Sequence, residues 1–156
     1  MFPVLRQFGL PIGVEESWEA LRDLDDQAVG KIVQGSVEAL PFPDRTFHLI
    51  TALDVLEHLD NDRAVLSEFH RLCTDDGFLL VTVPAFRFLW GPQDKISHHR
   101  RRYTAKDLGS RVEASGFSVV RLNERSLHCR FPRWRRREGK ATGDLCRRSA
   151  LRFAQK

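Results

Sequence analysis

Residues 47–58 read FHLITALDVLEH, and this stretch decides how the rest of the chain is interpreted. Its first seven residues, 47–53, are mostly apolar and have the length of a buried β-strand. Asp54 follows at once, and His58 comes four residues later. In open α/β sheets, ligands bind beyond the carboxyl ends of the strands. The pattern therefore predicts a core strand with polar side chains at its ligand-binding end.

Outward from this stretch, apolar runs alternate with helical patterns in both directions. Such alternation is typical of repeated βα units and predicts an α/β fold with a parallel sheet. Asp75-Asp76-Gly77 is expected to form a turn, and a loop is expected from Pro84 to Tyr103. A loop of that length is more often functional than decorative. The other predicted elements are strands at 10–14, 31–34, 78–83 and 117–122, and helices at 18–26, at 61–73 and from Thr104 to Gly116.

Charge is distributed unevenly along the chain. Residues 1–99 carry 8 Lys/Arg against 16 Asp/Glu, a balance of −8, whereas residues 100–156 carry 17 against 5, a balance of +12. A basic segment attracts the phosphates of nucleic acid or of anionic lipid. The alternative interpretation is a solvated tail with no partner. Hydrophobic periodicity largely disappears after residue 122.

Several classes of protein find no support in the sequence. It contains no nucleophile elbow, no phosphate-binding P-loop and no zinc-protease motif. The three cysteines, Cys73, Cys129 and Cys146, are widely spaced, so neither a disulfide framework nor a zinc site is expected. No catalytic residue and no metal ligand is assigned. Without a long apolar segment or a recognisable signal peptide, a cytoplasmic location is expected.

Three segments in order carry a family resemblance. Residues 35–44 read GSVEALPFPD, residues 54–58 read DVLEH, and a predicted helix, turn and strand follow. This order resembles the type 11 methyltransferase domain family, which belongs to the class I S-adenosylmethionine-dependent methyltransferases. The resemblance covers residues 10–122 and is densest from 33 to 84. It implies a Rossmann-like α/β fold, an open and mostly parallel sheet with flanking helices, S-adenosylmethionine as cofactor and an unidentified methyl acceptor.

The resemblance also assigns cofactor-binding residues. It places Glu15 on the ribose hydroxyls, Ser36 and Val37 at the adenine edge, and Asp54 at the methionine end of the cofactor. Two of these assignments have a structural alternative. The alternative for Glu15 is an acid favoured at a helix N-terminus, and the alternative for Ser36 is an ordinary turn residue.

A narrower resemblance covers residues 89–104, where L-W, D and H-x-R-R-Y-T match a bacterial subgroup of the family. It implies that His99, Arg102 and Tyr103 lie on the acceptor side, with His58 shaping the entrance. An anionic acceptor would suit these side chains. The alternatives are a basic surface loop that binds nothing, and a His58 that only caps or packs.

The chain also departs from the family pattern. His48 stands where the family usually has Asp, and only nine residues precede residue 10, with no G-x-G among them. The resemblance therefore implies a domain truncated at its N-terminus, lacking the first family strand and its glycine-rich loop. We expect a partial methyltransferase domain over 1–122, with methyl transfer impaired or lost.

Residues 123–156 are expected to form a basic, poorly ordered tail where the family usually adds another strand. Two further interpretations stay open. The chain could be a non-catalytic module that binds anionic partners through its basic C-terminal region. It could also be a product with no function of its own.

Overall fold

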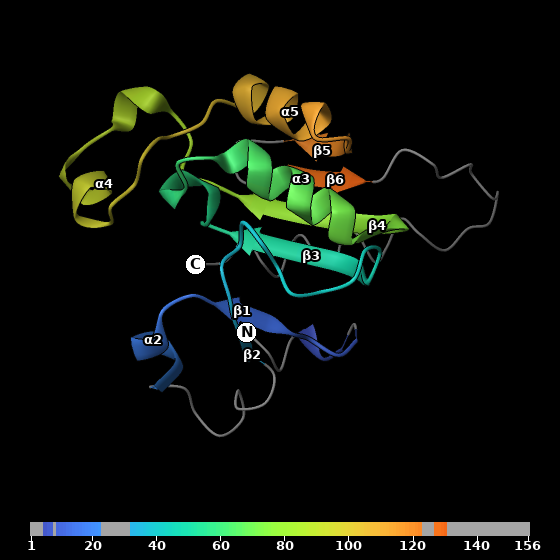
Figure 1. Cartoon of the computed structure of the whole chain (residues 1–156). Helices are drawn as coiled ribbons and strands as arrows, with labels where there is room; N and C mark the ends of the chain where they lie inside the picture. Colours follow the sequence, from blue (N-terminus) through green and yellow to red (C-terminus); the bar gives the residue numbers. More distant parts are fainter. Residues whose placement is uncertain (1–4, 8, 23–31, 123–126, 131–156) are drawn as a thin grey trace. The chain divides into compact units, whose positions relative to one another are not determined.

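The computed structural model describes residues 5–7, 9–22, 32–122 and 127–130. The chain divides into two compact units, Met1–Phe42 and Pro43–Lys156 (Figure 1). Each unit has its own sheet. Within the described ranges, no helix has both the length and the apolar character needed to cross a membrane.

The first unit contains a pair of short parallel strands and a helix. Strands β1 (Gly13–Glu15) and β2 (Ile32–Gln34) pair in parallel, with Glu15 opposite Gln34. Helix α2 (Trp18–Arg22) follows β1. The Ser17 hydroxyl accepts a hydrogen bond from the Ala20 N–H at 3.2 Å, which satisfies one donor of the first helical turn. The strand–helix–strand order confirms the predicted βα pattern.

The second unit is built on a four-stranded sheet in the order β3-β4-β6-β5. Strands β3 (Phe47–Leu53) and β4 (Cys73–Thr82) are parallel, and β3 has the bounds predicted from the sequence. Strand β6 (Leu127–Arg130) runs antiparallel between β4 and β5 (Ser118–Leu122). The expectation that no strand follows residue 122 was wrong here, because four residues show too little periodicity to reveal a strand. The boundary predicted at 122 is otherwise untested, since residues 123–126 and 131–156 lie outside the described ranges.

Two helices, α3 (Asp62–Leu72) and α5 (Ala105–Ala114), pack side by side over one face of this sheet (Figure 1). Both begin at side-chain caps, because Asn61 accepts from the Ala64 N–H at 3.2 Å and Thr104 from the Asp107 N–H at 3.1 Å. Burying each large apolar side chain contributes roughly 1.5–3 kcal/mol. The core contributed by these helices and the sheet includes Val65, Leu66, Phe69, Leu72, Leu79, Val81, Leu108 and Val112.

Strand β4 begins earlier than predicted. Phe47 pairs with Cys73 and Leu49 with Phe78, so residues 74–77 lie opposite a single position of β3. The predicted turn is therefore an irregularity inside the strand. Gly77 is buried there, and a Cβ on it would meet the Cys73 Sγ at 2.6 Å. Only glycine fits this close approach without a shift of its neighbours.

The long segment between β4 and α5 contains short helical turns. Helices η2 (Arg87–Leu89) and α4 (Pro92–Ile96) interrupt it, and Ala85 forms a parallel bridge with Tyr103 near its end. A third short helix, η1 (Leu56–His58), follows β3 directly. Because β3 and β4 are parallel, η1 and the long segment both begin at the carboxyl ends of neighbouring strands.

Candidate functional site

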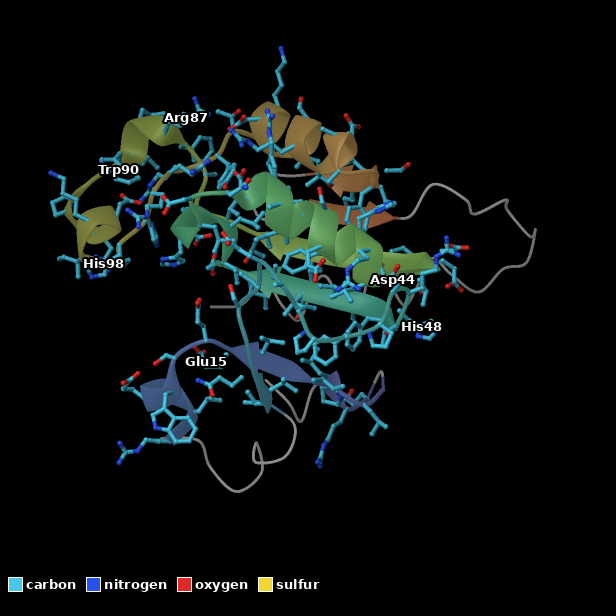
Figure 2. All side chains as sticks on the ribbon, in the orientation of Figure 1. Glu15, Asp44, His48, Arg87, Trp90 and His98 are labelled. Carbon is cyan, nitrogen blue, oxygen red and sulfur yellow. The ribbon has the colours of Figure 1, made fainter. Side chains whose placement is uncertain are left out.

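In the first unit, three of the predicted cofactor residues lie at the same edge of the sheet. Glu15 ends β1 where the chain turns towards α2 (Figure 2), and the Gly35 N–H donates to the Glu15 carbonyl at 3.1 Å. Ser36 and Val37 therefore follow β2 beside the end of β1. This is the edge at which nucleotide ligands bind in α/β folds.

The side chains of Glu15 and Ser36 also make local contacts, as expected for an acid at a helix N-terminus and for a turn residue. Glu15 Oε1 accepts from the Ser17 N–H at 2.9 Å, and Ser36 Oγ accepts from the Glu38 N–H at 3.3 Å. These bonds fix the two side chains but do not exhaust their capacity. A carboxylate offers about four lone-pair positions and a hydroxyl two, together with one donor.

Asp54 lies in the second unit, at the end of β3. Its backbone N–H donates to the Thr82 carbonyl at 3.0 Å, and the Thr82 hydroxyl donates to Asp54 Oδ1 at 3.3 Å. Its φ of 54° lies in the left-handed region, where Asp is tolerated better than most residues. Unusual backbone conformations cluster at functional sites. The strand end is thus held in a sharp, specific turn with an exposed carboxyl group.

His58 and His99 come together beyond Asp54. Their rings meet edge to face with centroids 4.8 Å apart. The loop that carries His99 is joined to η1, because the Arg100 N–H donates to the Glu57 carbonyl at 2.6 Å. Desolvation of its ring lowers the pKa of His58, and the nearby His99 adds to the effect. Both effects favour the neutral form of the His58 imidazole.

Glu57 is the neighbour of this histidine pair that sequence reasoning missed. The side chain is fully buried, and burial raises the pKa of its carboxyl to about 7. Glu57 lies within residues 47–58, the stretch on which the sequence analysis is based. The sequence did not predict its burial, because a short helical turn has no apolar periodicity that would reveal which side faces inward.

The other predicted acceptor-side residues have their polar groups engaged within the protein. The Arg102 guanidinium donates to both carboxylate oxygens of Asp94, at 2.7 and 3.0 Å. Tyr103 is buried, and its hydroxyl donates to Asp62 Oδ2 at 2.7 Å. Burial, with Asp62 beside it, raises the pKa of Tyr103 well above its usual range. Contact of either residue with an acceptor stays a prediction.

Comparisons with known proteins agree with this architecture. The Methyltransferase domain family matches residues 4–81. A probable S-adenosylmethionine-dependent methyltransferase of Mycolicibacterium smegmatis is 30% identical over 90 residues, which span 56% of this chain. The chain covers only 35% of that relative's length.

Solved structures show the same fold. An S-adenosylmethionine-dependent methyltransferase of Thermotoga maritima, named a possible histamine N-methyltransferase, superposes with a TM-score of 0.60 at 22% identity. That alignment covers 73% of this chain and 58% of the other. The PH0226 protein of Pyrococcus horikoshii superposes with a TM-score of 0.65 at 16% identity, over 81% of this chain and 74% of the other. At such identities the likeness concerns the fold alone.

The fold is thus the Rossmann-like α/β fold of methyltransferases, with parallel strands and flanking helices. The family match over residues 4–81 reaches half of the chain and places it within that class. The chain belongs to the Methyltransferase domain family, whose relatives include S-adenosylmethionine-dependent enzymes.

Proposed function

We propose that this chain binds S-adenosylmethionine through Glu15, Ser36, Val37 and Asp54, and that the activity it serves is transfer of the cofactor's methyl group to an acceptor. Membership of the Methyltransferase domain family carries the proposal. The closeness of the ends of β1 and β2 supports it, because Glu15 and Ser36 lie at one edge of the same sheet.

The residues of the first unit fit a nucleoside. A carboxylate at the end of a strand can accept hydrogen bonds from both ribose hydroxyls. The Ser36 hydroxyl and the Val37 N–H can read the edge of an adenine, since one can accept and the other donate. Asp54, with its carboxyl exposed at the end of β3, would bind the amino-acid part of the cofactor.

The acceptor would lie among His58, His99, Arg102 and Tyr103. Methyl transfer from a sulfonium depends chiefly on aligning the nucleophile, the carbon and the sulfur, so positioning supplies much of the catalysis. A base is required only when the acceptor must lose a proton. We assign no base, and these residues would orient the acceptor and exclude water.

Affinity for the cofactor is expected to be low. The family resemblance places the cofactor's amino-acid part in a glycine-rich loop, whereas the printed sequence contains no G-x-G. We therefore propose that methyl transfer by these 156 residues alone is slow or absent.

Calorimetric titration with S-adenosylmethionine and with its demethylated product tests the proposal. We expect weak, saturable binding that Glu15→Gln reduces about 10–100-fold, because one hydrogen bond to a charged group contributes about 1.5–3 kcal/mol. Glu16→Gln is the matched control, since Glu16 is the exposed neighbour of Glu15. The affinity of this variant for S-adenosylmethionine should equal that of the parent chain. Absence of saturable binding at millimolar ligand would refute the activity but not the family membership.

The basic C-terminal region favours a second candidate function, the binding of anionic lipid or nucleic acid. Ion pairs within the described residues support placing this function further along the chain. Arg100, Arg101, Arg102 and Arg111 are all ion-paired with acidic residues, so their charges are partly compensated. Residues 131–156, which lie outside the described ranges, carry nine more Lys/Arg.

This second candidate predicts binding to anionic vesicles or nucleic acid that weakens steeply with salt. Deleting residues 131–156 should abolish the binding while keeping β6. Binding that survives the deletion, or that is absent at low salt, would rule this function out.

A further inference from the structure

Three side chains in the second unit converge with the atoms that metal ions prefer. Glu57, His58 and His99 each offer one ligand atom, and these atoms all lie within 4.8 Å of one another. The first two come from η1 after β3, and the third comes from the segment after β4. The cluster therefore lies at the carboxyl ends of neighbouring parallel strands.

Glu57 is the member of this cluster that calls for a partner. The residue is 0% exposed, and neither carboxylate oxygen has a hydrogen-bond partner among the described residues. A buried polar group without a partner costs free energy, and an ionised one costs more. A cation held at this point would satisfy both oxygens.

A neighbouring carboxylate holds the His99 ring. Its Nδ1 lies 3.0 Å from Asp94 Oδ1. Arg102 donates hydrogen bonds to both oxygens of the Asp94 carboxylate, so Asp94 acts as an acceptor here. When His99 donates to it through Nδ1–H, the lone pair on Nε2 is available to a metal ion. A carboxylate that orients a ligating histidine in this way is common around protein-bound zinc.

We infer that Glu57, His58 and His99 form a binding site for a divalent transition-metal ion such as Zn²⁺. Two imidazoles and one carboxylate are a known zinc ligand set that leaves a coordination position open. Cations that prefer oxygen alone, such as Mg²⁺ and Ca²⁺, fit this donor set less well.

The geometry needs only a small adjustment. Bonds of about 2.0–2.2 Å in a tetrahedral site place ligand atoms roughly 3.4 Å apart. Atoms now within 4.8 Å of one another would therefore close by about an ångström. His58 is exposed and His99 is partly exposed, so both rings have room to move and the ion has a route from solvent.

This site does not depend on the proposed methyl transfer. Metal and S-adenosylmethionine would use different residues, so each can be measured while the other fails. His58 and His99 are also among the residues proposed to contact the acceptor, so an oxygen or nitrogen of that molecule could complete the coordination.

Titration of chelator-treated full chain with Zn²⁺ and with Co²⁺ tests the site. We expect one ion per chain, and visible Co²⁺ absorption bands of the kind that tetrahedral nitrogen and oxygen ligands produce. Glu57→Gln and His99→Ala should each weaken binding at least about tenfold, and Asp94→Asn should weaken it about 10–100-fold through the orientation of His99. Circular dichroism on each variant verifies that the fold is kept.

Two other histidines supply matched controls (Figure 2). His48 lies near the amino end of β3, and His98 is the sequence neighbour of His99 with a φ of 55°. His48→Ala and His98→Asn should leave metal affinity unchanged, since Asn tolerates that backbone conformation.

Absence of stoichiometric binding would overturn the inference. Equal losses in the controls and the ligand variants would do so too, as would an intense near-ultraviolet thiolate band, which would place the ion on cysteines. Calorimetry with S-adenosylmethionine on the same samples reports separately on the methyltransferase proposal.

Discussion

Two neighbouring regions of the second unit bury carboxyl groups in opposite ways. Asp62 is 2% exposed at the start of α3, and it accepts from the Tyr103 hydroxyl and from the Arg111 guanidinium. Glu57 is 0% exposed in η1, five residues earlier, with no hydrogen-bond partner among the described residues. The comparison separates a carboxyl group that holds the fold together from one that is available to a ligand.

The largest expected effect comes from removing the Asp62 carboxyl group, which accepts hydrogen bonds from Tyr103 and Arg111. Asp62→Ala would take one acceptor from the buried Tyr103 hydroxyl, which keeps the Leu56 carbonyl at 3.1 Å, and one carboxylate from Arg111, which keeps Asp107. Removing one partner of a buried ion pair costs about 3–5 kcal/mol, and these remaining partners place the expected loss at the lower end of that range. Urea denaturation should therefore show a loss of that order in the free energy of unfolding. Asp62→Asn, which keeps an acceptor for Tyr103, should lose less; equal losses would mean that charge alone matters.

Replacing Glu57, whose carboxyl group has no hydrogen-bond partner among the described residues, should raise the free energy of unfolding. Burial raises the pKa of Glu57 from 4.5 to about 7, so the folded chain keeps a proton that the unfolded chain releases between these values. Stability therefore falls as pH rises through this window. Glu57→Gln should unfold with about 3 kcal/mol more free energy than the parent at pH 8, and about equally at pH 4.5, in the presence of chelator. A parent chain that is the more stable at pH 8 would contradict this.

Asp94 should show the reverse pH dependence. The hydrogen bonds from Arg102 lower its pKa, so its contribution is present above its ordinary value and is lost as pH falls through the folded-state pKa. Thermal melts between pH 5 and pH 2 should show a smaller acid-induced decline for Asp94→Asn than for the parent. Parallel declines would mean that another carboxyl group governs acid stability.

The smallest effect is expected for an exposed pair nearby. Arg100 Nε lies 3.4 Å from Asp60 Oδ1, and the two side chains are 57% and 80% exposed. Solvent screens such pairs, so Arg100→Ala should change the free energy of unfolding by less than about 0.5 kcal/mol. This variant gives the baseline against which the buried carboxyl groups are judged in the same urea titration.

The local pattern of apolar and polar residues was sufficient to predict much of the fold. The apolar run at 47–53 predicted β3 with its observed bounds, and α3 and α5 each begin one residue after the start predicted for them. These features depend on residues close together in sequence. Strand β6 was missed because its pairing with β4 joins residues about fifty positions apart, and four residues alone give no period.

The candidate site was predictable only in part. His58 and His99 were singled out separately, but nothing in the sequence indicated that their rings meet, since the two residues are 41 positions apart. Glu57 was missed because its burial depends on how η1 packs. Arg102 and Tyr103 were assigned from resemblance, which cannot show that Asp94 and Asp62 already engage their polar groups.

The antiparallel insertion of β6 has a consequence for the order of folding. Strands β5 and β6 lie only a few residues apart and can form a hairpin locally, but β4 gains its second neighbour only when β6 arrives. During synthesis, β4 therefore waits with an unpaired edge until residue 130 has left the ribosome. Unpaired edges invite association with other chains, so a ribosome that stalls before β6 would release a nascent chain prone to aggregation.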